Sequence, residues 1–152
     1  MTKTLFSKNN LLFILRLAIG WVFLYSGLTK VMDPAWTSSG FLQNAESLKG
    51  IYTWFSSPEN ITWVDILNKW GQTLIGLGLI TGTFTRLASY FGMLLMALYY
   101  LPSLKFPYVE HGFLVDEHVI YFLVFAVLAS ARIGEYFGID KYLTKGYKSW
   151  WL

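Results

Sequence analysis

Residues 11–31 read LLFILRLAIGWVFLYSGLTKV, and only Arg16 and Lys30 interrupt the run of apolar and weakly polar side chains. A bilayer core about 30 Å thick needs about 20 predominantly apolar residues in a helix that crosses it. We therefore expect this segment to span a membrane. Lys3 and Lys8 precede the segment, as in a secretory signal, but the apolar stretch is long and no A-x-A-like cleavage site follows it.

Three further apolar segments follow, at residues 63–84, 87–104 and 113–133. The second and third segments are separated by Thr85 and Arg86 alone, so we expect them to be antiparallel neighbours. Hydrophobic residues make up 55 % of the 152 residues and charged residues 14 %, against roughly a quarter charged in a typical soluble chain. The sequence predicts one all-α domain over residues 1–152, an integral membrane four-helix bundle.

Lysines and arginines are distributed unevenly between the two ends of these segments. With the N-terminus inside, the inner ends carry Lys3, Lys8, Arg16, Arg86, Arg132, Lys141, Lys145 and Lys148, and the outer ends carry Lys30, Lys49, Lys69 and Lys105. An excess of Lys and Arg marks the cytoplasmic side. We predict a multi-pass protein of the cell (inner) membrane with both termini cytoplasmic, including a tail at 134–152.

The first outer loop, between Asp33 and Thr62, is too long for a simple turn. Its apolar residues recur at helical spacing: Phe41, Ala45, Leu48, Tyr52 and Phe55. This periodicity predicts an amphipathic helix over about 40–55 that lies in the outer membrane interface.

Several function classes are excluded by composition. The chain has no cysteine, which removes disulfides, thiol catalysis and iron–sulfur clusters. Its two histidines, His111 and His118, lie seven residues apart, and on one helix they could not reach opposite sides of one haem iron. We expect no metal site, and the scattered net charge of +3 gives no footprint for nucleic acid.

Polar residues inside the predicted bundle share helix faces, as costly groups in lipid do when they turn inward. On the first segment the stripe is Arg16, Gly20, Phe23, Gly27 and Lys30. On the second it is Asp65, Asn68, Lys69, Gln72, Gly76, Thr83 and Arg86. On the fourth it is His118, Phe122, Phe125, Ala129 and Arg132.

Each of these residues also has a structural interpretation. Arginines and lysines at helix ends extend to the headgroups and set topology, and glycines permit close helix packing. Gln72 is different, because a buried amide near mid-membrane needs a hydrogen-bonding partner. The cluster at the outer mouth of the fourth segment is a proton acceptor, a metal site or a solvated loop: Glu110, His111, Asp116, Glu117 and His118.

Three stretches resemble the DoxX/DoxD family. They are RLAIG at 16–20 leading to GLTK at 27–30, GQTLIGLGLITGTFTR at 71–86, and residues 116–133 followed by Ile139-Asp140. The resemblance implies a four-helix membrane fold. Its DoxD branch includes a subunit of a thiosulfate:quinone oxidoreductase, which implies quinone-linked electron transfer together with a second membrane subunit. Many members carry an acidic residue where this chain has Gln72.

A quinone-linked role assigns hypotheses to individual side chains. Gln72 and His118 would contact the quinone ring, Phe122 and Phe125 would wall its slot, and Arg16 and Arg86 would complete the quinone site. His118, Glu117 and Asp65 would move protons, and Lys30 and Lys69 would meet an anionic donor from outside. The alternatives are a non-catalytic accessory subunit of a larger membrane complex, or a solute- or lipid-handling protein. Homo-oligomerisation stays open in each case.

Overall fold

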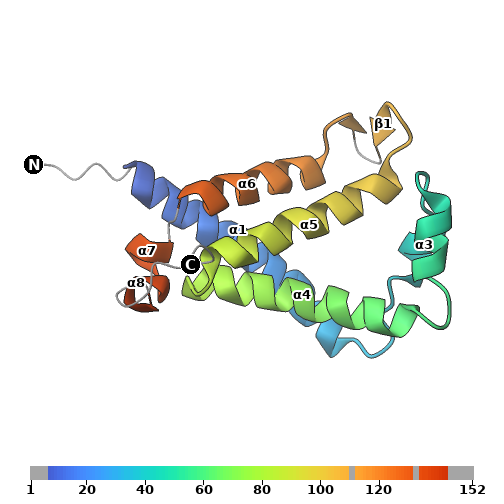
Figure 1. Cartoon of the computed structure of the whole chain (residues 1–152), viewed down its shortest axis with the longest axis horizontal. Helices are drawn as coiled ribbons and strands as arrows, with labels where there is room; N and C mark the ends of the chain where they lie inside the picture. The colour runs from blue at the N-terminus through green and yellow to red at the C-terminus, as the bar shows by residue number, and fades with distance from the viewer. Residues whose placement is uncertain (1–6, 110–111, 132–133, 144–152) are drawn as a thin grey trace, which may run out of the picture.

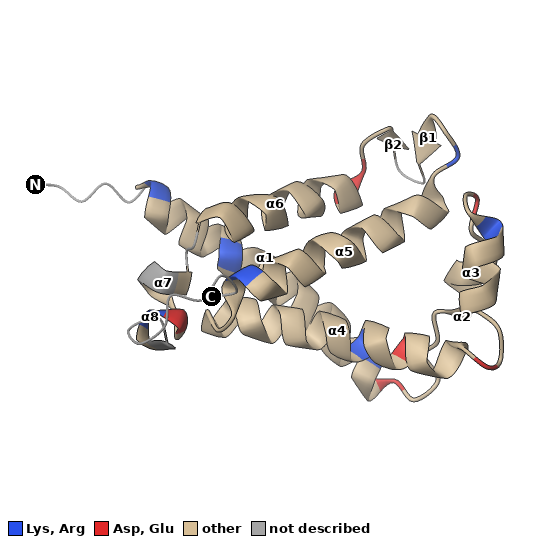
Figure 2. Cartoon of the chain, in the orientation of Figure 1, with Lys and Arg blue, Asp and Glu red and all other residues tan. Residues whose placement is uncertain are grey.

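The computed structural model describes residues 7–109, 112–131 and 134–143. Within these ranges the chain is mostly helical, and four long helices pack on one another: α1 (Lys8–Met32), α4 (Ile61–Thr81), α5 (Thr85–Ser103) and α6 (Glu117–Ala131). Helix α1 lies against α4, and α5 lies against α6 (Figure 1). Figure 2 shows charged segments at the starts of α5 and α6 and none midway along either helix, whereas α4 carries charged segments in the half nearer α3.

Helix α1 begins where Ser7 accepts a hydrogen bond from the backbone N–H of Asn10, and it ends at Asp33, before Pro34. It packs closely on α4 because glycines face the contact. A Cβ on Gly27 would collide with the backbone of Thr73, and one on Gly76 would collide with the backbone of Leu24. The two backbones therefore touch, which is how glycines bring membrane helices together.

The α4–α5 connection is as short as expected, because Gly82 and Phe84 both adopt left-handed backbone angles (φ 69° and 50°). From this turn the two helices diverge (Figure 1). The first turn of α5 is capped from the far end of the sequence. Asp140 accepts hydrogen bonds from the backbone N–H groups of Phe84 (2.7 Å) and Thr85 (3.0 Å).

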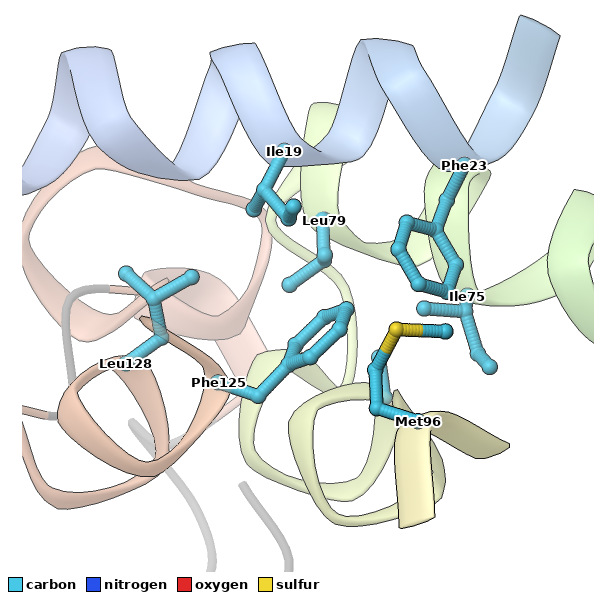
Figure 3. Close-up of a cluster of buried hydrophobic side chains, with 8 residues drawn as sticks. Ile19, Phe23, Ile75, Leu79, Met96, Phe125 and Leu128 are labelled. Atoms are coloured by element: carbon cyan, nitrogen blue, oxygen red, sulfur yellow. The ribbon is translucent and has the colours of Figure 1, made fainter. Parts of the chain in front are cut away.

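The buried core lies between α1, α4, α5 and α6 and is apolar (Figure 3). The Phe23 ring of α1 meets the Phe125 ring of α6 edge to face, with centroids 4.9 Å apart. Gly92 of α5 lies directly under the Phe125 ring, where a Cβ could not fit without moving that ring. The surrounding side chains of this core are Ile19, Ile75, Leu79, Met96 and Leu128.

The outer loop differs from the single helix predicted over 40–55. The structure has two short helices, α2 (Ser39–Gln43) and α3 (Lys49–Phe55), with Leu48 between them in a left-handed conformation (φ 52°). The interruption is held by tertiary contacts: Glu46 N–H donates to the Pro102 carbonyl (2.7 Å), and Ser47 Oγ donates to the Leu104 carbonyl. Bonds to the end of α5 thus replace helical bonds that periodicity alone would favour.

The last predicted span, 113–133, begins later than expected. Residues before it form a small antiparallel hairpin, β1 (Tyr108–Val109) with β2 (Gly112–Phe113). Asp116 then starts α6 by accepting from the backbone N–H groups of His118 (3.0 Å) and Val119 (3.2 Å). Two short helices, α7 (Gly134–Phe137) and α8 (Asp140–Leu143), follow, and the rest of the predicted tail lies outside the described residues.

Among the described residues, α1 is the helix whose length and mean hydropathy, 2.0 over its most apolar window, suit a membrane crossing. Helix α6 is apolar but has only 15 residues in the described part of the chain. The other two long helices, α4 and α5, do not meet the same combined requirement of length, mean hydropathy and low charge.

Candidate functional site

The predicted site residues divide into two groups at opposite ends of the long helices. On α1, Arg16 and Lys30 lie fourteen residues apart, which is about 21 Å along a helix. Ile19 and Phe23 lie between them and belong to the apolar core. We call the group around Lys30 the outer group and the group around Arg16 the inner group, after the orientation that the sequence predicts.

The outer group forms a hydrogen-bonded network with Gln72 at its centre. Gln72 Oε1 accepts from Lys30 Nζ (2.7 Å) and from Ser26 Oγ (3.1 Å). Its amide Nε2 donates to the Tyr99 hydroxyl (2.9 Å), which in turn donates to Asn68 Oδ1 (2.6 Å). The partner that a buried amide requires is therefore supplied by two other helices, α1 and α5.

Two cations of this group share one aromatic ring. Lys30 Nζ lies 5.1 Å from the Trp36 ring centroid, and Lys69 Nζ lies 5.3 Å from it. Lys30 Nζ also lies 5.8 Å from the Tyr99 ring. Within the described residues neither ammonium has a carboxylate at ion-pair distance. Cation–π contacts stabilise the two charges without neutralising them.

His118 joins the outer group through Tyr99, since the two rings meet edge to face at 6.0 Å. Its Nδ1 lies 2.8 Å from Asp116 Oδ2, and Asp116 is itself buried. Glu117, the predicted relay beside it, is exposed at the start of α6. Asp65 faces the outer loop instead and accepts from the backbone N–H (2.8 Å) and Oγ (2.6 Å) of Ser38.

The acid–histidine cluster is placed only in part, because Glu110 and His111 lie outside the described residues. Asp116, Glu117 and His118 can each bring one ligand atom within 4.8 Å of the others, which is a spacing that a metal ion could use. The contact between His118 and Asp116 already engages two of these three groups.

The inner group surrounds Arg16, which is only 1 % exposed. Its Nη2 donates to the carbonyl of Phe137 (2.7 Å), its guanidinium lies 5.1 Å from the Phe13 ring, and Asp140 is the nearby negative charge. Arg16 Nε and Nη1, Thr85 Oγ1 and Arg86 Nε are buried and have no hydrogen-bond partner among the residues that the structure describes. This end of the molecule therefore joins α1 and the α4–α5 turn to the C-terminal helices.

The predicted quinone slot between Arg16, Gln72 and His118 is filled by the apolar core. Phe125, expected as a wall of that slot, is fully buried against Phe23, and Phe122 packs on the same core. Because protein interiors are close-packed, these residues leave no room for a ring between the two polar ends. The residues present do not fit a quinone at that position.

A different apolar cavity lies where α4 and α5 diverge. This groove, which we call the α4–α5 groove, has a volume of about 840 Å³, within the range of about 300–1,000 Å³ found for small-molecule sites. Its walls include Leu67, Leu74, Phe91 and Leu98, and Gly71 gives it depth because a Cβ there would meet nothing within 4 Å. Leu67 and Leu98 line the groove, and their sequence neighbours Asn68 and Tyr99 belong to the outer network at the same level of the two helices.

Three members of the outer group were not anticipated as such. Tyr99 connects α4 to α6, Trp36 lies beside the two lysines, and Ser26 supports Gln72. Asp116 was expected in the acid–histidine cluster, and in the structure it contacts His118. The third apolar segment carries two adjacent tyrosines, Tyr99 and Tyr100, near its outer end, and hydroxyls at that depth were the available signal.

The fold and the site together define a small helical membrane protein with polar groups gathered at its two ends. The family model DoxX matches residues 11–101, which is well over half of the chain. The chain belongs to the DoxX family. The match names DoxX rather than the DoxD branch, and it ends before α6. No curated protein and no solved structure matches the chain.

Proposed function

We propose that this chain is a multi-pass inner-membrane subunit, with both termini cytoplasmic, of a quinone-linked oxidoreductase of the thiosulfate:quinone type. The observation that carries the proposal is the outer network, in which α1, α4, α5 and α6 each contribute a polar side chain. Polar groups inside a membrane protein are costly and mark sites of function. The helices α1, α4, α5 and α6 are then the four spans.

The donor site of this proposal is the pair Lys30 and Lys69 beside Trp36. Two ammonium groups from neighbouring helices, with no carboxylate paired to either in the described part of the chain, attract a small divalent oxyanion. Lys30 Nζ donates to Gln72 Oε1 with one of its three N–H groups, which leaves donor capacity for an anion.

The quinone in this proposal uses the α4–α5 groove rather than the predicted slot. The groove is apolar, which suits an isoprenoid chain arriving from the lipid. Its lining residues Gly71 and Leu98 lie at the same level along α4 and α5 as Gln72 and Tyr99 of the network. A bound quinone would supply the two-electron acceptor. Gln72 Nε2 donates one of its two N–H groups to Tyr99 and would keep the other for a ring oxygen. Because the chain has no cysteine, a thiol or iron–sulfur route between donor and quinone would belong to a second subunit.

The test is thiosulfate-dependent quinone reduction in membranes that contain the complete complex. We expect Lys30→Gln and Lys69→Gln each to weaken thiosulfate affinity by about tenfold, as loss of a charge-assisted hydrogen bond of about 1.5 kcal/mol implies. The matched control is Lys49→Gln, which changes an exposed outer lysine on α3 and should leave turnover unchanged. Unchanged kinetics in both site variants would contradict the proposal.

A second candidate, a non-catalytic accessory subunit packed against a larger membrane complex, is favoured by the α4–α5 groove itself. A groove with almost purely apolar walls and a glycine floor also suits a partner's helix. Purification in mild detergent distinguishes the oxidoreductase role from the accessory role. A stoichiometric large partner with no bound quinone favours the accessory role, and co-purified quinone favours the oxidoreductase.

A further inference from the structure

A second cavity lies at the outer end, between the α2 loop, the end of α5 and the β1 strand. Its volume is about 500 Å³. It is lined by one acid, one base and aromatic and amide groups: Glu46, Lys105, Phe41, Tyr108 and Asn44, with Pro102 at its back. None of these residues belongs to the donor site or the α4–α5 groove.

The two sides of this cavity are held by backbone contacts. Glu46 N–H donates to the Pro102 carbonyl (2.7 Å), which fixes the α2 loop against the end of α5. On the other side, Lys105 and Tyr108 exchange backbone hydrogen bonds of 2.8 Å each. The charged side chains therefore project from anchored segments.

Opposite charges face the cavity without neutralising one another. Among the described residues, neither the Glu46 carboxylate nor the Lys105 ammonium forms an ion pair, although both line the same space. A ligand that carries a cation and an anion a few ångströms apart would satisfy both groups. The Phe41 and Tyr108 rings add faces on which an ammonium is stabilised.

The neighbourhood of the cavity has the composition of a membrane interface. Phe106, Tyr108 and Phe113 are 80 %, 63 % and 61 % exposed, and the last two rings meet edge to face with centroids 5.7 Å apart. Aromatic rings gather at headgroup depth in membrane proteins. The cavity thus lies where the helix α5 leaves the apolar region and lipid headgroups begin.

We propose that this cavity binds a primary ammonium joined to a phosphate, as in the headgroup of a phosphatidylethanolamine lipid, with Glu46 holding the ammonium and Lys105 the phosphate. The same chemistry exists in free phosphoethanolamine, so the lipid and the soluble zwitterion are two sources of one ligand. The site is independent of the electron-transfer role.

The experiment measures lipid retention by native mass spectrometry on the purified full-length chain with its partners. The probes are dioleoyl phosphatidylethanolamine, dioleoyl phosphatidylglycerol and free phosphoethanolamine. We expect the ethanolamine lipid to be retained over the glycerol lipid. Glu46→Gln should lower the affinity for the ethanolamine lipid by about fivefold, as loss of an interaction of about 1 kcal/mol at an open site implies. It should leave the affinity for the glycerol lipid unchanged.

Lys105→Gln should lower the affinity for both lipids, because both carry a phosphate. The matched controls are Glu59→Gln and Lys49→Gln, which change exposed outer residues that do not line the cavity. Glu46-dependent binding of free phosphoethanolamine would identify the headgroup alone as sufficient. Binding of the lipid only would assign the membrane as the source. The proposal would be overturned if the wild type and Glu46→Gln retained the ethanolamine lipid equally. Thermal unfolding would first show that both proteins are folded.

Discussion

The two faces of α4 contain glycines with opposite surroundings. On the face towards α1, Gly76 lies against the backbone of Leu24, and there is no space for a methyl group. On the face towards α5, Gly71 opens into the α4–α5 groove, and a Cβ would meet nothing. Glycine therefore permits backbone contact on the α1 side of α4 and leaves open space on the α5 side. The difference comes from how closely the neighbouring helix approaches.

The tight face gives the largest expected effect. Gly76→Ala forces the α1 and α4 backbones apart, and overpacking of this kind costs about 1–3 kcal/mol or more. Since α1 also carries Lys30 to Gln72, separation should break that 2.7 Å contact as well. We expect a thermal midpoint in detergent lower by several degrees. A midpoint equal to wild type would mean that the two helices are not in backbone contact.

The network that extends across both faces gives an intermediate effect. Gln72→Leu keeps the side-chain volume but leaves Lys30, Ser26 and Tyr99 without their shared partner. A buried group deprived of its hydrogen bond costs about 1–3 kcal/mol. We expect a lower thermal midpoint together with reduced quinone turnover. Asn68→Leu is a useful comparison, because it removes only the acceptor of Tyr99. If Gln72→Leu were no less stable than Asn68→Leu, the central position of Gln72 would be refuted.

The open face gives the smallest effect, with the opposite sign. Gly71→Ala adds a methyl group in free space and improves helix propensity, which should raise stability by about 0.5–1 kcal/mol. Paired with Gly76→Ala, it is a same-helix, same-substitution control measured by the same thermal unfolding. If Gly71→Ala lowered the thermal midpoint, the space beside Gly71 would have to be occupied, and the open α4–α5 groove would be refuted.

The sequence predicts the four long helices to within a few residues at most of their ends. Length and apolarity place α1 at 8–32 against the expected 11–31, and α5 at 85–103 against 87–104. The exceptions arise from tertiary contacts. The single helix expected over 40–55 is divided because Glu46 and Ser47 bond to the end of α5, and Phe113 belongs to a hairpin rather than to the last helix.

The site was predictable in its parts but not in its grouping. Helical periodicity placed Arg16, Gly20, Phe23 and Gly27 on one buried face, as the structure has them. Position along the segments placed Arg16 at an inner end and Gln72 near mid-membrane. It could not reveal that an apolar core fills the space between them, because periodicity gives an angle around a helix and does not show what packs between helices. For the same reason Tyr99, on a segment with no polar stripe, was missed.

The cap on α5 has a consequence for how the chain can be divided. The backbone N–H groups of Phe84 and Thr85 find their acceptor in Asp140, more than fifty residues later, and no side chain caps the helix locally. The segment 11–101 that carries the family signature therefore does not contain everything its own helices require. During synthesis the turn after α4 cannot form these two bonds until the ribosome has delivered Asp140.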